Sequence, residues 1–139
     1  MPKIFLFLFF SLYILSCSNE SSQKIVQGEI YGTTWQLKYF SENKEVPIKA
    51  IITEELNRID DLFSHYKDDS LTSLINKKEI DFREASEEWK KLDQLGWNVH
   101  SKSKGYFNHK ITGNYDFNSF AKGYAVDKVS DLLKANNIN

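Results

Sequence analysis

The sequence predicts an α+β domain, because it contains both a strand pattern and helix patterns. Trp35, Leu37 and Tyr39 alternate with polar residues, which is typical of a half-buried β-strand. Between positions 48 and 63, apolar residues recur at three- and four-residue spacing, which is typical of an amphipathic helix. The same spacing returns between positions 89 and 99. Strands and helices are therefore both expected, within one domain.

The N-terminal segment has the character of a secretory signal. Lys3 precedes the apolar run IFLFLFFSLYIL, which is shorter than the roughly 20 residues that span a bilayer. The run ends in Ile-Leu-Ser-Cys, which resembles the lipobox of bacterial lipoproteins and implies a lipid on Cys17. We predict a lipoprotein signal peptide over 1–16, a flexible tether over 17–24 and a domain over 25–139. The lipid would anchor the chain to a membrane of the bacterial cell envelope, facing the periplasm or the outside. The alternative is a cleaved signal peptide with an incidental cysteine.

The first elements of the domain are expected to be two strands. Residues 25–31 have strand character that Gly28 interrupts, and Gly32 permits a turn or a close approach. Together with the strand around Leu37, this segment predicts a β-hairpin or two neighbouring strands.

A long amphipathic helix is expected next, with Pro47 at its first position. Its buried face is predicted to consist of Ile48, Ile51, Ile52, Leu56, Ile59, Leu62 and Phe63. A loop begins at Ser64, and Asp69 or Ser70 is expected to cap one or two helical turns that reach Asn76.

A second long helix is expected to begin after the capping residue Ser86 and to end before Gly105. Its apolar stripe is predicted to consist of Trp89, Leu92, Leu95 and Val99. A short strand is expected over 114–117, ahead of the last helix.

The last predicted helix begins near Ser119 or Phe120 and ends at the asparagines 136–137. Free N–H groups at a helix start favour an anion, and Lys122 adds a positive charge in the first turn. Asp116 can accept hydrogen bonds from a ribose or a base edge, so the cluster suits a nucleotide. In the alternative, Asp116 and Ser119 only cap the helix, Lys122 is solvated, and the adjacent glycine permits close helix packing.

The polar segment SHYKDDS, from Ser64 to Ser70, offers an aromatic ring beside a lysine, which can stack on a flat ring system. In the alternative it is a solvated loop with capping aspartates. His65, His100 and His109 lack the spacing of a metal site, so surface histidines are the expectation. The net charge of −1 argues against a nucleic-acid partner, which requires a basic excess.

Four blocks of the sequence resemble the ApbE family of flavin transferases, which are often bacterial lipoproteins. In the family's order they are GEIYGTTWQLKYF, LFSHYKDDSLTSLIN, KGYFN and DFNSFAKGYAVDKVSDLLK. The AKGYAVD portion is the most specific, and SHYKDDS is the next. The resemblance covers most of the chain after the tether, and it implies a T-fold-related domain.

The resemblance also implies an activity and a set of site residues. The family transfers FMN from FAD to a threonine of a target protein, which forms a phosphoester bond, releases AMP and requires Mg²⁺. Some members instead hydrolyse FAD to FMN and AMP. The FAD-binding positions correspond here to Tyr31, Tyr66, Tyr106, Phe107, Asn108, Asp116 and Lys122. The backbone carbonyl of Ser119 corresponds to a magnesium ligand.

The chain also departs from the family pattern. Asn108 stands where the family commonly has aspartate, and only HKITGNY separates it from Asp116, where the family has a longer segment. After Lys134 the chain lacks the family's glycine-rich strand, its nucleotide-contacting histidine and its late metal-binding Asp/Thr cluster. Ser119 alone cannot complete an octahedral magnesium site. We therefore expect a partial domain without its C-terminal part, and the alternative function is a non-catalytic lipoprotein fragment that at most binds flavin or a partner.

Overall fold

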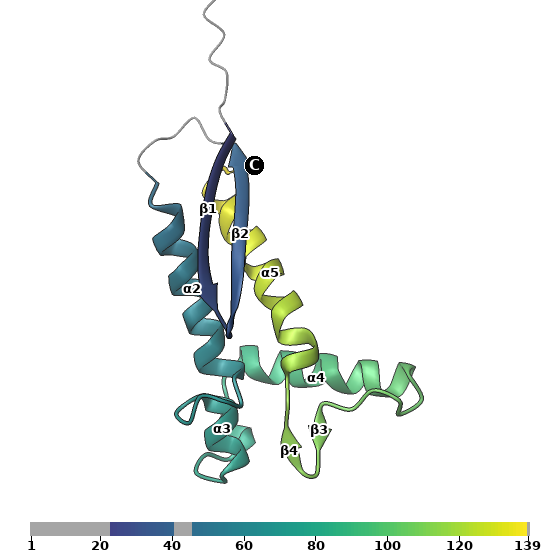
Figure 1. Ribbon diagram of the computed structural model, residues 1–139. Helices are drawn as coiled ribbons and strands as arrows, with labels where there is room; N and C mark the ends of the chain where they lie inside the picture. Colours follow the sequence, from purple (N-terminus) through teal and green to yellow (C-terminus); the bar gives the residue numbers. More distant parts are fainter. Residues whose placement is uncertain (1–22, 41–45, 139) are drawn as a thin grey trace, which may run out of the picture.

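The computed structural model describes residues 23–40 and 46–138 (Figure 1). The signal peptide predicted over 1–16 and the lipidation site predicted at Cys17 lie outside these residues. Within the described ranges, none of the helices is both long and apolar enough to cross a bilayer. Helices and strands both occur along the described chain, which confirms the α+β class.

The chain begins with a long β-hairpin. Strand β1 (Gln23–Ile30) pairs antiparallel with β2 (Thr33–Phe40) along their whole length. The two turn residues, Tyr31 and Gly32, have φ angles of 56° and 66°, and two positive φ angles are typical of a type I′ turn. The hairpin prediction is confirmed, but β1 begins two residues early, inside the predicted tether. Gly28 does not interrupt the strand, since it pairs with Trp35 in the register of the hairpin. The ring of Trp35 lies over this glycine, and a Cβ there would come within 2.8 Å of that ring.

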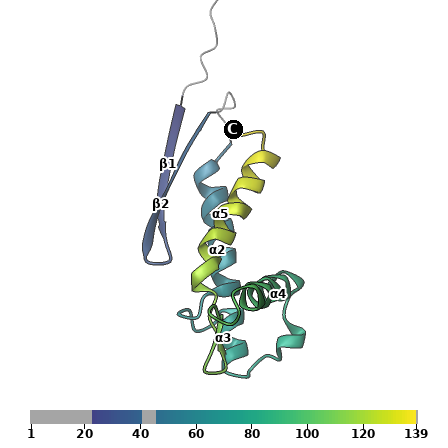
Figure 2. The ribbon, with the colours of Figure 1, turned by 90° about the vertical axis from the view of Figure 1, so that its right-hand side faces the viewer.

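Two long helices, α2 (Ile48–Phe63) and α5 (Asn118–Ala135), pack against each other (Figure 2). The hairpin lies along this helix pair, and β1 contacts α2. Five of the predicted positions on α2 are fully buried, namely Ile48, Ile52, Leu56, Ile59 and Phe63. Pro47 occupies the N-cap position of α2 rather than its first helical position.

Beyond the hairpin lie α3 (Leu71–Asn76), a single 3₁₀ turn (Phe82–Glu84) and α4 (Glu87–Lys102). The side chains of Ser70 and Ser86 accept hydrogen bonds from the backbone N–H three residues further on, at 3.1 and 3.2 Å. Both predicted serine caps are therefore confirmed, and of the two candidates at α3 the cap is Ser70.

Aromatic side chains join these helices to the start of α5. Phe117 is fully buried, and its ring centroid lies 5.3 Å from those of both Phe63 and Trp89, in edge-to-face geometry. The indole N–H of Trp89 donates to Thr72 Oγ at 2.9 Å, and Thr72 in turn donates to the carbonyl of Leu62 at 2.7 Å. One continuous core therefore fixes α2, α3, α4 and α5 relative to one another.

The second half of α4 extends away from this core (Figure 1). Trp89 and Leu92 are buried as predicted, but Leu95 and Val99 are 48% and 40% exposed. The predicted apolar stripe is therefore wrong in its C-terminal half, because the segment that packs on this part of α4 contacts the face of Gly96 and leaves Leu95 and Val99 exposed.

His109 is buried under α4, which corrects the expectation of a surface histidine. Its Nε2 lies 2.7 Å from Asp93 Oδ1, so the buried ring has a polar partner. Gly96 makes room for the ring, since a Cβ at this position would lie 2.5 Å from His109 Nδ1.

A second, minimal hairpin leads into α5. It pairs β3 (Lys110–Ile111) with β4 (Asn114–Tyr115), and the sequence did not predict β3. The predicted strand over 114–117 ends early, because Phe117 already occupies the N-cap position of α5. The Asn76 side chain bonds both the N–H and the carbonyl of Tyr115, at 2.7 and 2.9 Å, and so ties β4 to α3. At its other end α5 stops at Asn136, as predicted.

A charged network ties α2, α4 and α5 together at the surface. Arg58 bonds Glu88 through two nitrogens, at 2.6 and 2.9 Å, and also bonds Glu55. The hydroxyl of Tyr124 donates to Glu88 Oε1 at 2.5 Å. The hydrogen bonds from Arg58 lower the pKa of Glu88 to about 2. Bidentate pairing of this kind gives the network a defined geometry.

The Glu88→Gln variant should be less stable than the wild type at pH 7. A depressed folded-state pKa means that Glu88 stabilises the fold above its unfolded pKa, and that this contribution is lost as the pH falls through about 2. The stability difference should therefore shrink between about pH 5 and pH 2. Urea unfolding at several pH values measures it. Glu87→Gln is the matched control, because Glu87 shares the first turn of α4 but pairs only with Lys90. Equal losses in both variants at pH 7 would contradict the network.

Candidate functional site

A cleft of about 690 Å³ lies where α2 ends and α5 begins. Three segments that are distant in sequence line it. They contribute Tyr31 and Gly32 from the hairpin turn, Tyr66 and Lys67 from the loop after α2, and Asn118 and Lys122 from α5. Tyr31, Tyr66 and Lys122 are three of the predicted FAD-binding residues, so the fold brings them to one place. Cavities of this size are typical of small-molecule sites.

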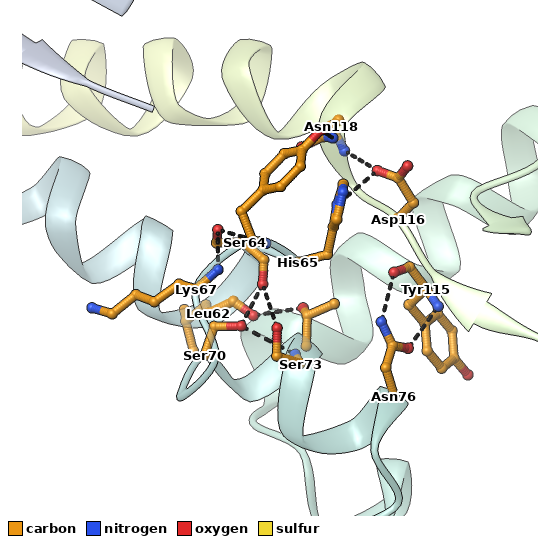
Figure 3. Close-up of polar contacts among 12 residues, drawn as sticks. Leu62, Ser64, His65, Lys67, Ser70, Ser73, Asn76, Tyr115, Asp116 and Asn118 are labelled. Carbon is orange, nitrogen blue, oxygen red and sulfur yellow. Dashed lines mark hydrogen bonds and ion pairs between the residues drawn. The ribbon is translucent and has the colours of Figure 1, made fainter. Parts of the chain in front are cut away.

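Serine side chains fold the loop after α2 into a compact turn (Figure 3). Ser64 Oγ accepts hydrogen bonds from the backbone N–H groups of Tyr66 and Lys67, at 3.3 and 3.2 Å. Ser70 Oγ donates to the carbonyl of Ser64 while it caps α3. SHYKDDS is therefore an ordered turn whose shape its own side chains determine, and not only a solvated loop.

Tyr66 is exposed but held in place. Its side chain is 79% accessible to solvent, yet its ring lies on that of His65 with a centroid distance of 3.9 Å. The side-chain amide of Asn118, in the first turn of α5, donates to the Tyr66 hydroxyl at 3.3 Å. An accessible aromatic ring with two restraints presents a flat surface on which another ring can stack.

Asp116 lies directly before α5, on the far side of the same turn. Its Oδ1 accepts a hydrogen bond from the backbone N–H of Asn118 at 2.9 Å, so Asp116 satisfies a free N–H of the helix start, although the N-cap position itself belongs to Phe117 (Figure 3). The same oxygen lies 3.3 Å from His65 Nδ1. Ser119, the other predicted cap, makes no side-chain hydrogen bond within the described residues, so that part of the alternative is wrong.

Tyr31 links the hairpin turn to α2. Its hydroxyl donates to the carbonyl of Leu56 at 2.8 Å, so the side chain reaches back over the helix. Burial, together with the nearby carboxylates of Asp60 and Glu55, raises the pKa of Tyr31 above its ordinary value. The phenol therefore stays protonated and acts as a fixed hydrogen-bond donor.

Lys122 and Gly123 leave the first turns of α5 open. Lys122 lines the cleft and forms no ion pair with any described residue. A Cβ at Gly123 would meet nothing within 4 Å, so close helix packing does not explain this glycine. The surface beside Gly123 therefore has free space, and Lys122 offers a positive charge to an anionic ligand in the cleft.

Tyr31 and Lys122 also line a second, more apolar groove of about 570 Å³ between the hairpin and α5. Trp35 and Leu37 contribute from β2, and Val129 contributes from α5. The two cavities therefore border the same two side chains, one cavity mainly polar and the other mainly apolar.

The predicted residues Tyr106, Phe107 and Asn108 do not line the cleft. They lie in the loop after α4, where Tyr106 is 95% exposed and Asn108 accepts a hydrogen bond from the backbone N–H of Lys110. Phe107 reaches toward α5, and its ring lies 5.8 Å from that of Phe120. Asp116 does not line the cleft either, but lies with His65 in a separate pocket of about 350 Å³. The described structure therefore divides the predicted FAD-binding residues among three places.

The comparisons with known proteins bear on this arrangement. The model of the ApbE family matches residues 31–113 of the chain. The chain belongs to the ApbE family. The matched region contains Tyr31, Tyr66 and the 106–108 loop, and it ends before Asp116. The comparison with curated proteins finds no match.

Solved structures of ApbE proteins share the fold. The flavin transferase ApbE from Vibrio cholerae matches with a TM-score of 0.73 and 19% identity, over 84% of this chain and 55% of its own length. The apo form of flavinyl transferase ApbE from Pseudomonas stutzeri matches with a TM-score of 0.71 and 20% identity, over 83% of this chain and 56% of its own. The chain therefore spans little more than half the length of these ApbE relatives.

The described residues do not by themselves fit a magnesium ion. Among them, no three His, Cys, Asp or Glu side chains gather as a metal site would require. Mg²⁺ demands near-octahedral oxygen ligands, of which protein groups supply at least one or two carboxylates. Ser119 is exposed in the first turn of α5, and its predicted role as a ligand stays a prediction.

Two residues that sequence reasoning overlooked hold this site together. His65 was expected to be a surface histidine, but it is half-buried between Tyr66 and Asp116. Asn118 bonds Tyr66 through its side chain and Asp116 through its backbone. The contact of His65 with Asp116 and that of Asn118 with Tyr66 each join residues about fifty positions apart, and no local sequence pattern reveals contacts at that range.

Gly123→Ala should raise the free energy of unfolding by about 0.5–1 kcal/mol, because alanine loses less backbone entropy than glycine in a helix. Gly96→Ala is the matched control within α4, where the new Cβ meets the His109 ring at 2.5 Å. It should lower the free energy of unfolding by about 1–3 kcal/mol through overpacking. Urea denaturation measures both variants. A destabilising Gly123→Ala would contradict the open surface.

Proposed function

We propose that the chain takes part in magnesium-dependent transfer of FMN from FAD to a threonine of a target protein. Membership of the ApbE family supports flavin transfer in general. The observation that carries the proposal for this chain is the cleft, which gathers Tyr31, Tyr66 and Lys122 from three separate segments. An aromatic surface beside an open, positively charged helix start suits a ligand that combines flat rings with phosphates.

The described residues would divide the work of binding FAD. The ring of Tyr66 would stack on a flat ring of the dinucleotide, and Lys122 with the first turn of α5 would contact the phosphates. Asp116 would accept hydrogen bonds from a ribose hydroxyl or a base edge.

In the proposed reaction, the threonine oxygen bonds to the phosphorus of the FMN portion. The bond from that phosphorus to the oxygen bridging the two phosphates breaks, AMP leaves with this oxygen, and the threonine proton passes to a base. Fixed positive charge, such as that of Lys122, stabilises the charge that develops on the phosphate oxygens.

A non-catalytic role in binding flavin or a partner is the second candidate function. The observation that favours it is the lack of an acidic metal cluster among the described residues. For both functions we propose the same location, at the bacterial cell envelope, with a lipid anchor on Cys17.

Covalent flavinylation separates the two functions. The chain from Cys17 onward, incubated with FAD, Mg²⁺ and a target protein that carries the acceptor threonine, should increase the mass of the target by one FMN. Mass spectrometry measures the product, and a full-length ApbE protein run in parallel shows that the target is competent. An unmodified target beside a modified control would favour the binding role. AMP and FMN released without a modified target would indicate hydrolysis.

Lys122→Ala should weaken FAD binding about fivefold, because a contact to phosphate worth about 1 kcal/mol is lost. Lys128→Ala is the matched control on the same helix, since Lys128 lines neither the cleft nor the apolar groove. Quenching of flavin fluorescence in a titration measures both affinities. An equal loss of FAD affinity in the two variants would show that the phosphates do not bind at Lys122.

A further inference from the structure

We propose that His65 is a positioning residue for the flavin ligand. It would hold the ring of Tyr66 and the carboxylate of Asp116 at the same time, and so fix Tyr66, which lines the cleft, relative to Asp116, which lines a separate pocket together with His65. This inference rests on the proposed binding of FAD. It assigns a role to His65, which the family resemblance does not count among the FAD-binding positions.

The first observation is a closed ring of contacts between two distant segments (Figure 3). His65 stacks on Tyr66, and its Nδ1 faces Asp116 Oδ1 at 3.3 Å. Asp116 accepts the backbone N–H of Asn118, and the side chain of Asn118 returns to the Tyr66 hydroxyl. Each of the four residues therefore restrains the next, and the ring joins the loop after α2 to the start of α5.

The second observation concerns the polar atom of His65. Nδ1 is shielded from solvent and makes no well-aligned hydrogen bond to any described residue. The distance from Nδ1 to Asp116 Oδ1 is longer than that of a strong charge-assisted hydrogen bond. A buried polar atom without a full partner is unfavourable, so a small movement of Asp116 toward His65 is favoured. Contacts of this kind commonly tighten when a ligand binds.

The third observation is the exposure of the two groups that His65 holds. Tyr66 is 79% exposed, and the side chain of Asp116 is 33% exposed, so both are available to a ligand. The side chain of His65 is only 25% exposed and lies behind them. His65 is therefore placed to act through its neighbours rather than by direct contact. Preorganised groups bind a ligand more tightly because less freedom is lost on association.

Two substitutions at position 65 separate the two contacts. His65→Phe keeps a ring that can stack on Tyr66 but removes Nδ1. His65→Asn keeps a polar atom near the place of Nδ1 but removes the ring. We expect FAD affinity, measured by quenching of flavin fluorescence, to fall about fivefold or more in His65→Phe, with partial recovery in His65→Asn. In a turnover assay KM should rise more than kcat falls, because His65 does not contact the reacting atoms.

A double-mutant cycle with Asp116→Asn tests whether His65 acts through the carboxylate. If it does, His65→Phe causes little further loss of FAD affinity once Asp116 is asparagine. Additive losses would show a general structural effect and would overturn the positioning role. Wild-type affinity in His65→Phe would overturn it as well, while leaving the proposed function intact.

The wild type, His65→Phe, Asp116→Asn and the double variant are also unfolded by urea without flavin. A coupling between the two substitutions in the free energy of unfolding is the expected result, because the two side chains are in contact. Additive effects in this flavin-free cycle would overturn the positioning role independently of any ligand. A failure of the wild-type chain to bind FAD would instead overturn the proposed function, and the positioning role for flavin with it.

Discussion

The burial of Phe117 is the constraint on which the rest of the structure depends. Its ring is fully buried and packs edge to face on Phe63 and Trp89, so the start of α5 is fixed against α2 and α4. Asp116 and Asn118 lie on either side of Phe117 and are therefore fixed with it. The loop that carries Tyr66 begins directly after Phe63. The aromatic core thus sets the width of the cleft, although none of its rings needs to contact the ligand.

The regular elements could be predicted because their patterns are local. Alternation around Leu37 indicates a strand, three- and four-residue spacing between 48 and 63 indicates a helix, and the Ser70 and Ser86 caps act on the backbone three residues further on. The exposed end of α4 could not be predicted in the same way. Its spacing is that of a buried helix, but burial depends on whether another element covers it.

The site was predictable only in part. The family resemblance indicated Tyr31, Tyr66 and Lys122, which do line one cleft, but residues 106–108 lie apart from it. His65 and His109 show what the sequence omits: each meets a distant carboxylate, and the pairing depends on the tertiary fold. The exposed ring of Tyr66 and the positive charge of Lys122 suit a ligand that combines flat rings with phosphates, which supports the proposed binding of FAD.

The most direct test of the central claim is to map where FAD contacts the chain. In a titration followed by backbone amide NMR, the account predicts that FAD shifts the resonances of residues 31–32, 64–67 and 118–122 together and with a single affinity. All three segments line the cleft between α2 and α5. Shifts confined to residues 103–108, or to the exposed end of α4, would contradict the account.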